Sequence, residues 1–195
     1  MIRRTDNESF TTKAARLARH LARHPSSLPR WVRDRLTPGD PIARGLPWFS
    51  WAAIRWLDRW LQPSFTVHEL GGGGSTLWFA QRVARVVTLE SDARWLARLE
   101  GEIPHNVTLV HGASPSALPA EHADLIVIDS DLALRTGHVQ WALRQRNAAV
   151  IVDDSWRYRE FLPLDVTFFV GVGPCRLGVT ETALYVPTAH HQMTP

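Results

Sequence analysis

The sequence predicts an α/β fold in which a mostly parallel β-sheet is covered by helices on both faces. Strand-like and helix-like segments alternate from Phe65 onward, which is the order typical of parallel sheets. Four consecutive glycines, residues 71–74, separate the first strand from the helix that follows it. The length of 195 residues suits one domain with a sizeable core.

The first 46 residues are expected to form a helical extension, or cap, outside the sheet. Residues 12–24 read as an amphipathic helix, with Leu17 and Leu21 four positions apart among arginines. This basic segment favours either a solvated cap over a ligand cleft or a contact with an anionic partner. We expect the cap, and we do not expect nucleic acid as a partner.

The composition favours a cytoplasmic protein with no membrane partner. The formal net charge is only +3, and no stretch approaches the roughly 18–20 apolar residues of a membrane span. The N-terminus contains Arg3, Arg4 and Asp6 and lacks the apolar stretch of a secretory signal. Cys175 is the only cysteine, so an intrachain disulfide cannot form.

Seven strands are expected after the cap. In an open α/β sheet, ligands bind beyond the carboxyl ends of the strands, so polar residues at those ends are the candidate site. The strands, in chain order, are 65–70, 85–90, 107–111, 124–129, 148–153, 165–170 and 181–187.

The segment from strand 65–70 to Glu90 predicts a site for a nucleoside cofactor. Glycines let the backbone approach a ligand closely, and the helix opened by Ser75 and Thr76 presents free N–H groups to the loop. Glu90 ends the second strand, 90 − 71 = 19 residues after the first glycine, where a carboxylate can accept both hydroxyls of a ribose.

A dinucleotide is the less favoured ligand of this loop. The pattern G-x-G-x-x-G would place Thr76 or Leu77 where the third glycine belongs. Glu69, inside the first strand, would repel a pyrophosphate but suits a cationic ligand such as an ammonium group. An NAD-dependent enzyme is therefore the less favoured hypothesis.

The order Glu69-x-Gly71-x-Gly73, followed by Glu90, resembles motif I and its partner acid in class I S-adenosylmethionine-dependent methyltransferases. Other segments resemble successive parts of that family, so the resemblance covers about residues 46–187. These segments are the lead-in helix 47–57, strand 4 at 123–129, strand 5 at 148–155, and the closing hairpin formed by 169–174 and 180–185.

The resemblance implies a doubly wound, Rossmann-like, seven-stranded sheet in the order 3-2-1-4-5-7-6, with the last strand antiparallel. It implies a methyltransferase-like domain at 47–187, preceded by the extension 1–46 and followed by a tail at 188–195. The implied cofactor is S-adenosylmethionine, and the implied reaction is in-line methyl transfer to an oxygen or nitrogen of a small molecule.

By the same resemblance, the cofactor would be held at the ends of strands 1 to 4. Many relatives carry an acid after strand 3, but here His111-Gly112-Ala113 leads to Ser114, so Ser114 or a backbone carbonyl would contact the adenine. The expected cofactor-binding residues are Glu69, Gly71, Gly73, Ser75, Thr76, Glu90, Ser114 and Asp129.

The chemistry is expected beside strands 4 and 5. Asp129 and His138 are the candidate bases, since histidine titrates nearest neutral pH. The acceptor would contact residues after strand 5, namely Asp153, Asp154, Trp156 and Arg157.

A metal-dependent reaction is a second hypothesis for the same place. Asp129, Asp153 and Asp154 resemble the Mg²⁺ ligands of catechol-type O-methyltransferases, and oxygen ligands suit Mg²⁺. Asp154 stands where that family has asparagine, so a metal is not favoured. The same cofactor residues would also suit an aminocarboxypropyl transferase or a non-catalytic module that binds S-adenosylmethionine.

The tryptophans add one further expectation. Trp48, Trp51, Trp56 and Trp60 fall within one short helical segment and cannot all share one buried face. One pair is expected in the core, and the other in the pocket or at the interface of a homodimer.

Overall fold

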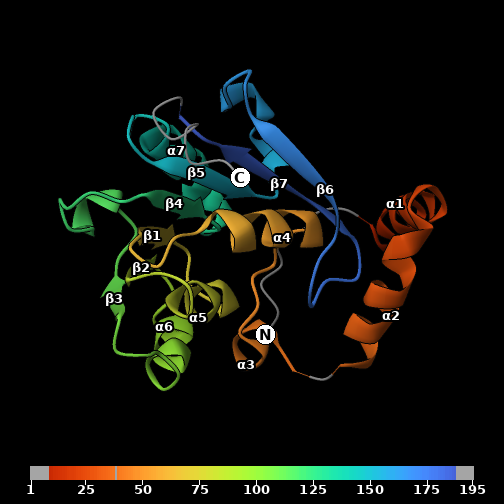
Figure 1. Ribbon diagram of the computed structural model, residues 1–195, viewed down its shortest axis with the longest axis horizontal. Helices are drawn as coiled ribbons and strands as arrows, with labels where there is room; N and C mark the ends of the chain where they lie inside the picture. The colour runs from red at the N-terminus through yellow and green to blue at the C-terminus, as the bar shows by residue number, and fades with distance from the viewer. Residues whose placement is uncertain (1–8, 38, 188–195) are drawn as a thin grey trace.

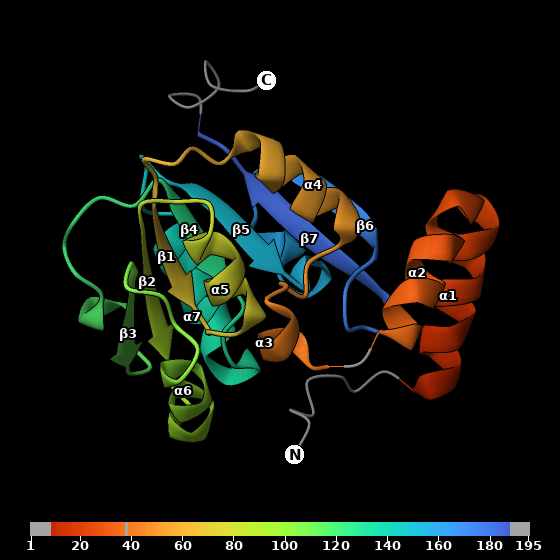
Figure 2. The same cartoon turned by 60° about the horizontal axis from the view of Figure 1, so that its bottom comes forward.

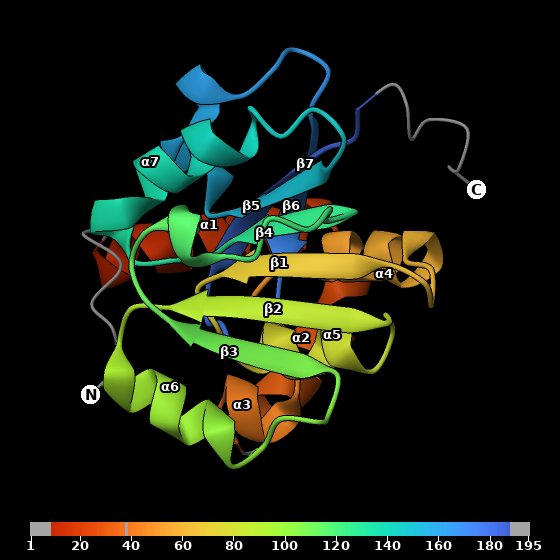
Figure 3. The same ribbon diagram turned by 90° about the vertical axis from the view of Figure 1, so that its left-hand side faces the viewer.

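The computed structural model describes residues 9–37 and 39–187 and contains a seven-stranded sheet in the order β3-β2-β1-β4-β5-β7-β6 (Figure 1). Strand β7 runs antiparallel to both β5 and β6, and the other neighbouring pairs are parallel. Figure 3 shows β3, β2, β1, β4 and β5 side by side in that order. The predicted strand order is confirmed, whereas the tail 188–195 lies outside the described residues.

Each observed strand ends within two residues of its predicted bounds. The strands are β1 Thr66–Leu70, β2 Arg85–Glu90, β3 Val107–His111, β4 Leu125–Ile128, β5 Ala149–Asp153, β6 Thr167–Val172 and β7 Val179–Tyr185. The agreement reflects apolar runs rich in β-branched residues, which fit a sheet buried on both faces.

Helices cover the two faces of the sheet and divide the core in two. Alternate residues of each strand face opposite sides: Val67 and Val127 pack toward α4 (Trp51–Trp60) and α5 (Gly74–Ala80), whereas Ile126 and Ile128 pack toward α7 (Leu132–Ala142). Glu69 is two residues after Val67, so it shares the face covered by α5. Helix α6 (Ala93–Glu100) follows β2.

The tryptophan-rich segment differs from the prediction at its start. Helix α4 begins at Trp51 because Ser50 caps it, its Oγ accepting from Ala53 N at 3.2 Å. Trp48 therefore precedes the helix and cannot stack on Trp51 through helical spacing. Trp56 and Trp60 do stack, with ring centroids 5.3 Å apart.

The N-terminal extension packs beside β6 and β7. Helices α1 (Phe10–Arg23) and α2 (Leu28–Leu36) stand at that edge of the sheet, and α3 (Pro41–Arg44) lies between them and α5 (Figure 2). Leu17 packs on Val172 and Val179 in a small third cluster. Short 3-10 turns lie at Pro25–Ser27, Pro115–Ala117, Ser155–Arg157 and Arg159–Phe161. Within residues 9–37 and 39–187, no helix has the length and apolar character needed to span a membrane.

Candidate active site

A cavity of about 550 Å³ lies beyond the carboxyl ends of the strands. Its volume falls within the range of small-ligand sites, and its position is the one expected for ligands of a doubly wound sheet. The glycine loop forms one side, Asp129 and Asp154 form another, and the N-terminal extension closes it. The extension contributes Asp34, Arg35, Thr37, Gly39, Asp40, Pro41, Arg44 and Leu46, and Trp48 follows it.

Two glycines allow the close approaches that shape this cavity. Gly71 has φ of +97°, and a Cβ there would lie 2.4 Å from the Asp129 carbonyl oxygen. A Cβ on Gly74 would lie 2.1 Å from the carbonyl oxygen of Pro41. Both distances are too short for any side chain, so glycine is required for the loop to touch β4 and for α3 to rest on α5.

Glu69 anchors the glycine loop from beneath. Its Oε2 accepts from the hydroxyls of Thr76 and Thr88, the latter at 2.9 Å, and the Thr76 hydroxyl accepts from Gly73 N at 3.0 Å. Burial raises the pKa of Glu69 to about 7, although hydrogen bonds from nearby hydroxyls act in the opposite direction. The buried Oε1 has no hydrogen-bond partner among the described residues. A nearby positive charge would favour the ionised form of such a buried carboxylate.

Glu90 holds the same loop from the neighbouring strand. Its Oε2 accepts from Gly72 N at 3.0 Å and its Oε1 from Asp92 N at 2.8 Å, and the residue is 1% exposed. An ionised carboxylate can accept about four hydrogen bonds, so holding the loop does not prevent it from also binding a ligand. Glu90 lies directly behind the loop and is not among the residues that line the cavity, so its predicted ribose contact stays a prediction.

A small lid that the sequence did not predict covers the loop. The indole N–H of Trp95 donates to the carbonyl of Gly72, and the guanidinium carbon of Arg98 lies 4.9 Å from the centroid of the Trp95 ring. Arg98 in turn forms an ion pair with Asp40 of the extension. The available signal was Asp92, which caps α6 and thereby places Trp95 on its first turn.

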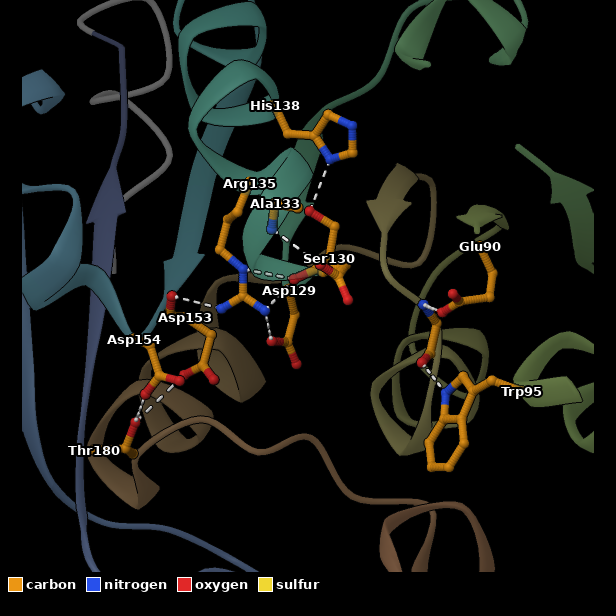
Figure 4. A network of polar contacts seen from close by, with 12 residues as sticks. Glu90, Trp95, Asp129, Ser130, Ala133, Arg135, His138, Asp153, Asp154 and Thr180 are labelled. Atoms are coloured by element: carbon orange, nitrogen blue, oxygen red, sulfur yellow. Dashed lines mark hydrogen bonds and ion pairs between the residues drawn. The ribbon is translucent and has the colours of Figure 1, made fainter. Parts of the chain in front are cut away.

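The acidic rim consists of Asp129, Asp153 and Asp154, and buried arginines compensate it. Arg135, 3% exposed, pairs with Asp129 at 2.8 Å and also donates to the Asp153 carbonyl at 3.3 Å (Figure 4). Arg176 pairs with Asp153 at 2.5 Å and with Asp154 at 2.9 Å. Sequence reasoning missed both arginines, because an arginine's position in the chain does not show which carboxylate it contacts in space.

The pKa values of the two adjacent carboxylates of the rim shift in opposite directions. Burial raises the pKa of Asp153 well above its usual range, although Arg176 opposes the rise. Burial also acts on Asp154, but Arg176 outweighs it and lowers the pKa of that carboxyl. Arg176 contacts both carboxylates, and Asp154 is the one of the two that lines the cavity.

His138 is placed as a brace between two loops. A carbonyl can only accept, so His138 Nε2 donates to the Ala113 carbonyl at 2.8 Å. In the neutral ring Nδ1 then accepts from the Ser130 hydroxyl at 2.7 Å (Figure 4). Burial lowers its pKa, which favours that neutral ring. His138 does not line the cavity, and its catalytic role stays a prediction.

The remaining predicted residues divide between the cavity and its surroundings. Gly73, Ser75, Asp129 and Asp154 line it, whereas Glu69, Thr76, Glu90 and Asp153 support it from behind. Ser114 caps a 3-10 turn, with its hydroxyl 2.8 Å from that of Ser116. Trp156 and Arg157 stack on each other at 4.1 Å and do not line the cavity.

The rim does not fit the Mg²⁺ site that the three aspartates suggested. Among residues 9–37 and 39–187, no group of three His, Cys, Asp or Glu side chains is arranged to hold a metal ion. The three carboxylates instead face the guanidinium groups of Arg135 and Arg176.

Comparisons with known proteins place the fold. The chain is 34% identical over 103 residues to a catechol O-methyltransferase of Mycobacterium tuberculosis, a match that covers 45% of this chain and 47% of the relative. The chain thus spans about half the length of this curated relative. No protein-family model matches.

Solved structures extend the likeness to most of the chain. An rRNA methylase from Streptococcus thermophilus superposes with a TM-score of 0.54 at 12% identity, covering 70% of this chain and 95% of that one. TYW2 of M. jannaschii in complex with AdoMet superposes with a TM-score of 0.50 at 11% identity, covering 68% and 72%. Together with the strand order, these likenesses show that the chain has the fold of class I S-adenosylmethionine-dependent methyltransferases.

Proposed function

We propose that this protein is an S-adenosylmethionine-dependent methyltransferase that acts on a small-molecule acceptor. The observation that carries the proposal is a single cavity that joins the glycine loop to the acidic rim. The loop offers backbone and small side chains to a cofactor, and the rim offers Asp129 and Asp154 to an acceptor. The extension lines much of this cavity, and a volume of about 550 Å³ favours a small acceptor over a macromolecule.

The charge on the cofactor side supports S-adenosylmethionine over NAD. Glu69 is fully buried, and its Oε1 lacks a partner among the described residues. The ammonium and sulfonium groups of S-adenosylmethionine would supply the missing positive charge nearby, whereas a pyrophosphate would add repulsion. Glu90 would accept the ribose hydroxyls in addition to the loop amides, since a carboxylate can accept several hydrogen bonds at once.

The residues of the rim would orient the acceptor and take its proton. When bound, S-adenosylmethionine supplies a methyl group activated for displacement from sulfur by an acceptor lone pair. Asp129 lines the cavity and pairs with Arg135, which supports the proposal that it would accept the proton that the acceptor oxygen or nitrogen releases. Arg135 holds this carboxylate in one orientation, which contributes positioning rather than chemistry.

Calorimetric titration of the full chain with S-adenosylhomocysteine and, separately, with NAD tests the cofactor. Saturable binding of S-adenosylhomocysteine alone is expected, and binding of NAD alone would overturn the proposal. Mass spectrometry after incubation with S-adenosylmethionine and a panel of phenols and amines then identifies the group transferred. An increment of one methyl group is expected, whereas an aminocarboxypropyl increment would identify an aminocarboxypropyl transferase.

A further inference from the structure

Arg176 lies against two adjacent carboxylates of the rim, Asp153 and Asp154. Its Nη2 is 2.5 Å from an oxygen of Asp153, and its Nη1 is 2.9 Å from an oxygen of Asp154 and 3.2 Å from the Thr180 hydroxyl. Asp153 is fully buried and Arg176 is only 19% exposed. One guanidinium thus bridges two adjacent carboxylates, a geometry that its planar fork permits.

The backbone is shaped to bring Arg176 to this place. A Cβ on Gly173 would lie 2.4 Å from the Phe49 carbonyl oxygen, so glycine lets the β6–β7 turn approach the start of α4. Among the described residues, two non-glycine residues have positive φ: Asp154 at 51° and Cys175 at 58°. The first binds Arg176 and the second precedes it. Such unfavourable conformations persist where the surroundings impose them, commonly at functional sites.

We propose that Arg176 takes the place of a divalent cation on this rim, so that the site positions its acceptor without a metal. Mg²⁺ binds carboxylate oxygens at about 2.0–2.1 Å, and the guanidinium covers the oxygens that it would need. A fixed positive charge there also repels a second cation.

This proposal assumes the proposed function, in which the cavity holds a methyl acceptor. It adds which acceptors the rim can take. Without a metal to chelate, the acceptor does not need two adjacent oxygens, and a single hydroxyl or amine suffices. Arg176 and Asp154 both line the cavity and would hold this group by hydrogen bonds. Arg176 is therefore a positioning residue for the rim carboxylates.

Mn²⁺ binding, followed by electron paramagnetic resonance of the full chain, tests the proposal. The wild-type protein is expected to bind no Mn²⁺ at the rim, whereas Arg176→Ala is expected to bind it there. Because a repelling charge is removed, the affinity of the rim for Mn²⁺ should rise by about tenfold or more relative to the wild type. Adding Asp153→Asn to that variant should abolish the site. Equal binding by the wild type and Arg176→Ala, or no gain in the folded variant, would overturn the proposal.

Two further variants keep the test decisive. Arg159→Ala, which breaks the ion pair with Glu181 on the same hairpin but outside the cavity, should gain no Mn²⁺ site. If Arg176→Ala does not fold, Arg176→Gln provides the same measurement with a side chain that fills more of the space. Wild-type binding of S-adenosylhomocysteine, measured in parallel, separates the two ideas: its absence removes the proposed function and leaves the Mn²⁺ result to decide the role of Arg176.

Discussion

The two sides of the cavity are built by different means. The glycine loop is shaped by hydrogen bonds to Glu69 and Glu90 and by close backbone contacts of its glycines with Asp129 and Pro41. The acidic rim is assembled by charge pairs whose members lie up to 23 residues apart, as Asp153 and Arg176 do. The shape of the glycine loop therefore depends on positions without side chains, whereas the acidic rim depends on which charged side chains meet.

The largest expected effect comes from filling the glycine loop. Gly71→Ala places a Cβ against the Asp129 backbone at a φ unfavourable to alanine, so we expect a loss of about 2–4 kcal/mol in the free energy of unfolding and loss of S-adenosylhomocysteine binding. Chemical denaturation and calorimetry measure both. Gly137→Ala in α7 is the control, since a Cβ there meets nothing within 4 Å and should leave stability equal or slightly higher.

A smaller effect is expected from changing Glu90, the carboxylate behind the loop. Glu90→Gln should weaken S-adenosylhomocysteine binding by about 1.5–3 kcal/mol, the range for a hydrogen bond to a charged group, which is about tenfold to a hundredfold. Calorimetric titration measures the change. Glu121→Gln, at an exposed ion pair with Arg85, should leave the affinity unchanged. An unaltered affinity in folded Glu90→Gln would contradict the cofactor assignment.

Glu69 gives the stability of the protein a pH dependence that originates in the glycine loop. Its folded pKa of about 7 lies above the ordinary 4.5. Between those values the folded state binds more protons than the unfolded state, so this group makes stability fall as pH rises from about 4.5 to about 7. Glu69→Gln should flatten that part of the profile, which thermal unfolding across this pH range measures. A cationic ligand should release a proton from Glu69 when it binds below about pH 7, detectable by calorimetry in buffers of different ionisation enthalpy.

The smallest effect is expected at the lid. Arg98 and Asp40 are 49% and 42% exposed, so Arg98→Ala should cost no more than about 1 kcal/mol of stability. Its informative readout is the dissociation rate of S-adenosylhomocysteine, which should rise if Arg98 holds Trp95 over the loop. Arg85→Ala, at a similarly exposed pair away from the cavity, is the control. Equal dissociation rates in the two variants would show that the lid does not retain the ligand.

The amino-acid sequence by itself determined the sheet and the loop. The alternation of segments and their resemblance to successive strands of the methyltransferase family predicted every strand to within two residues, and the four glycines predicted the turn between β1 and α5. These features are local: a strand period, a glycine and a strand-end acid each act within about twenty residues of chain. Helix α4 begins later than the resemblance implied, because the Ser50 side chain caps it and makes Trp51 its first residue.

Only the tertiary structure decided how the charges pair. An arginine carries the same charge wherever it stands, and its partner is set by distance in space, so nothing in the sequence assigned Arg176 to Asp153 and Asp154 or Arg98 to Asp40. The three aspartates alone suggested a metal site. The turn that Gly173 allows brings Arg176 among them. This contact is stabilising, because burying uncompensated carboxylates is costly and a guanidinium in direct contact offsets that cost.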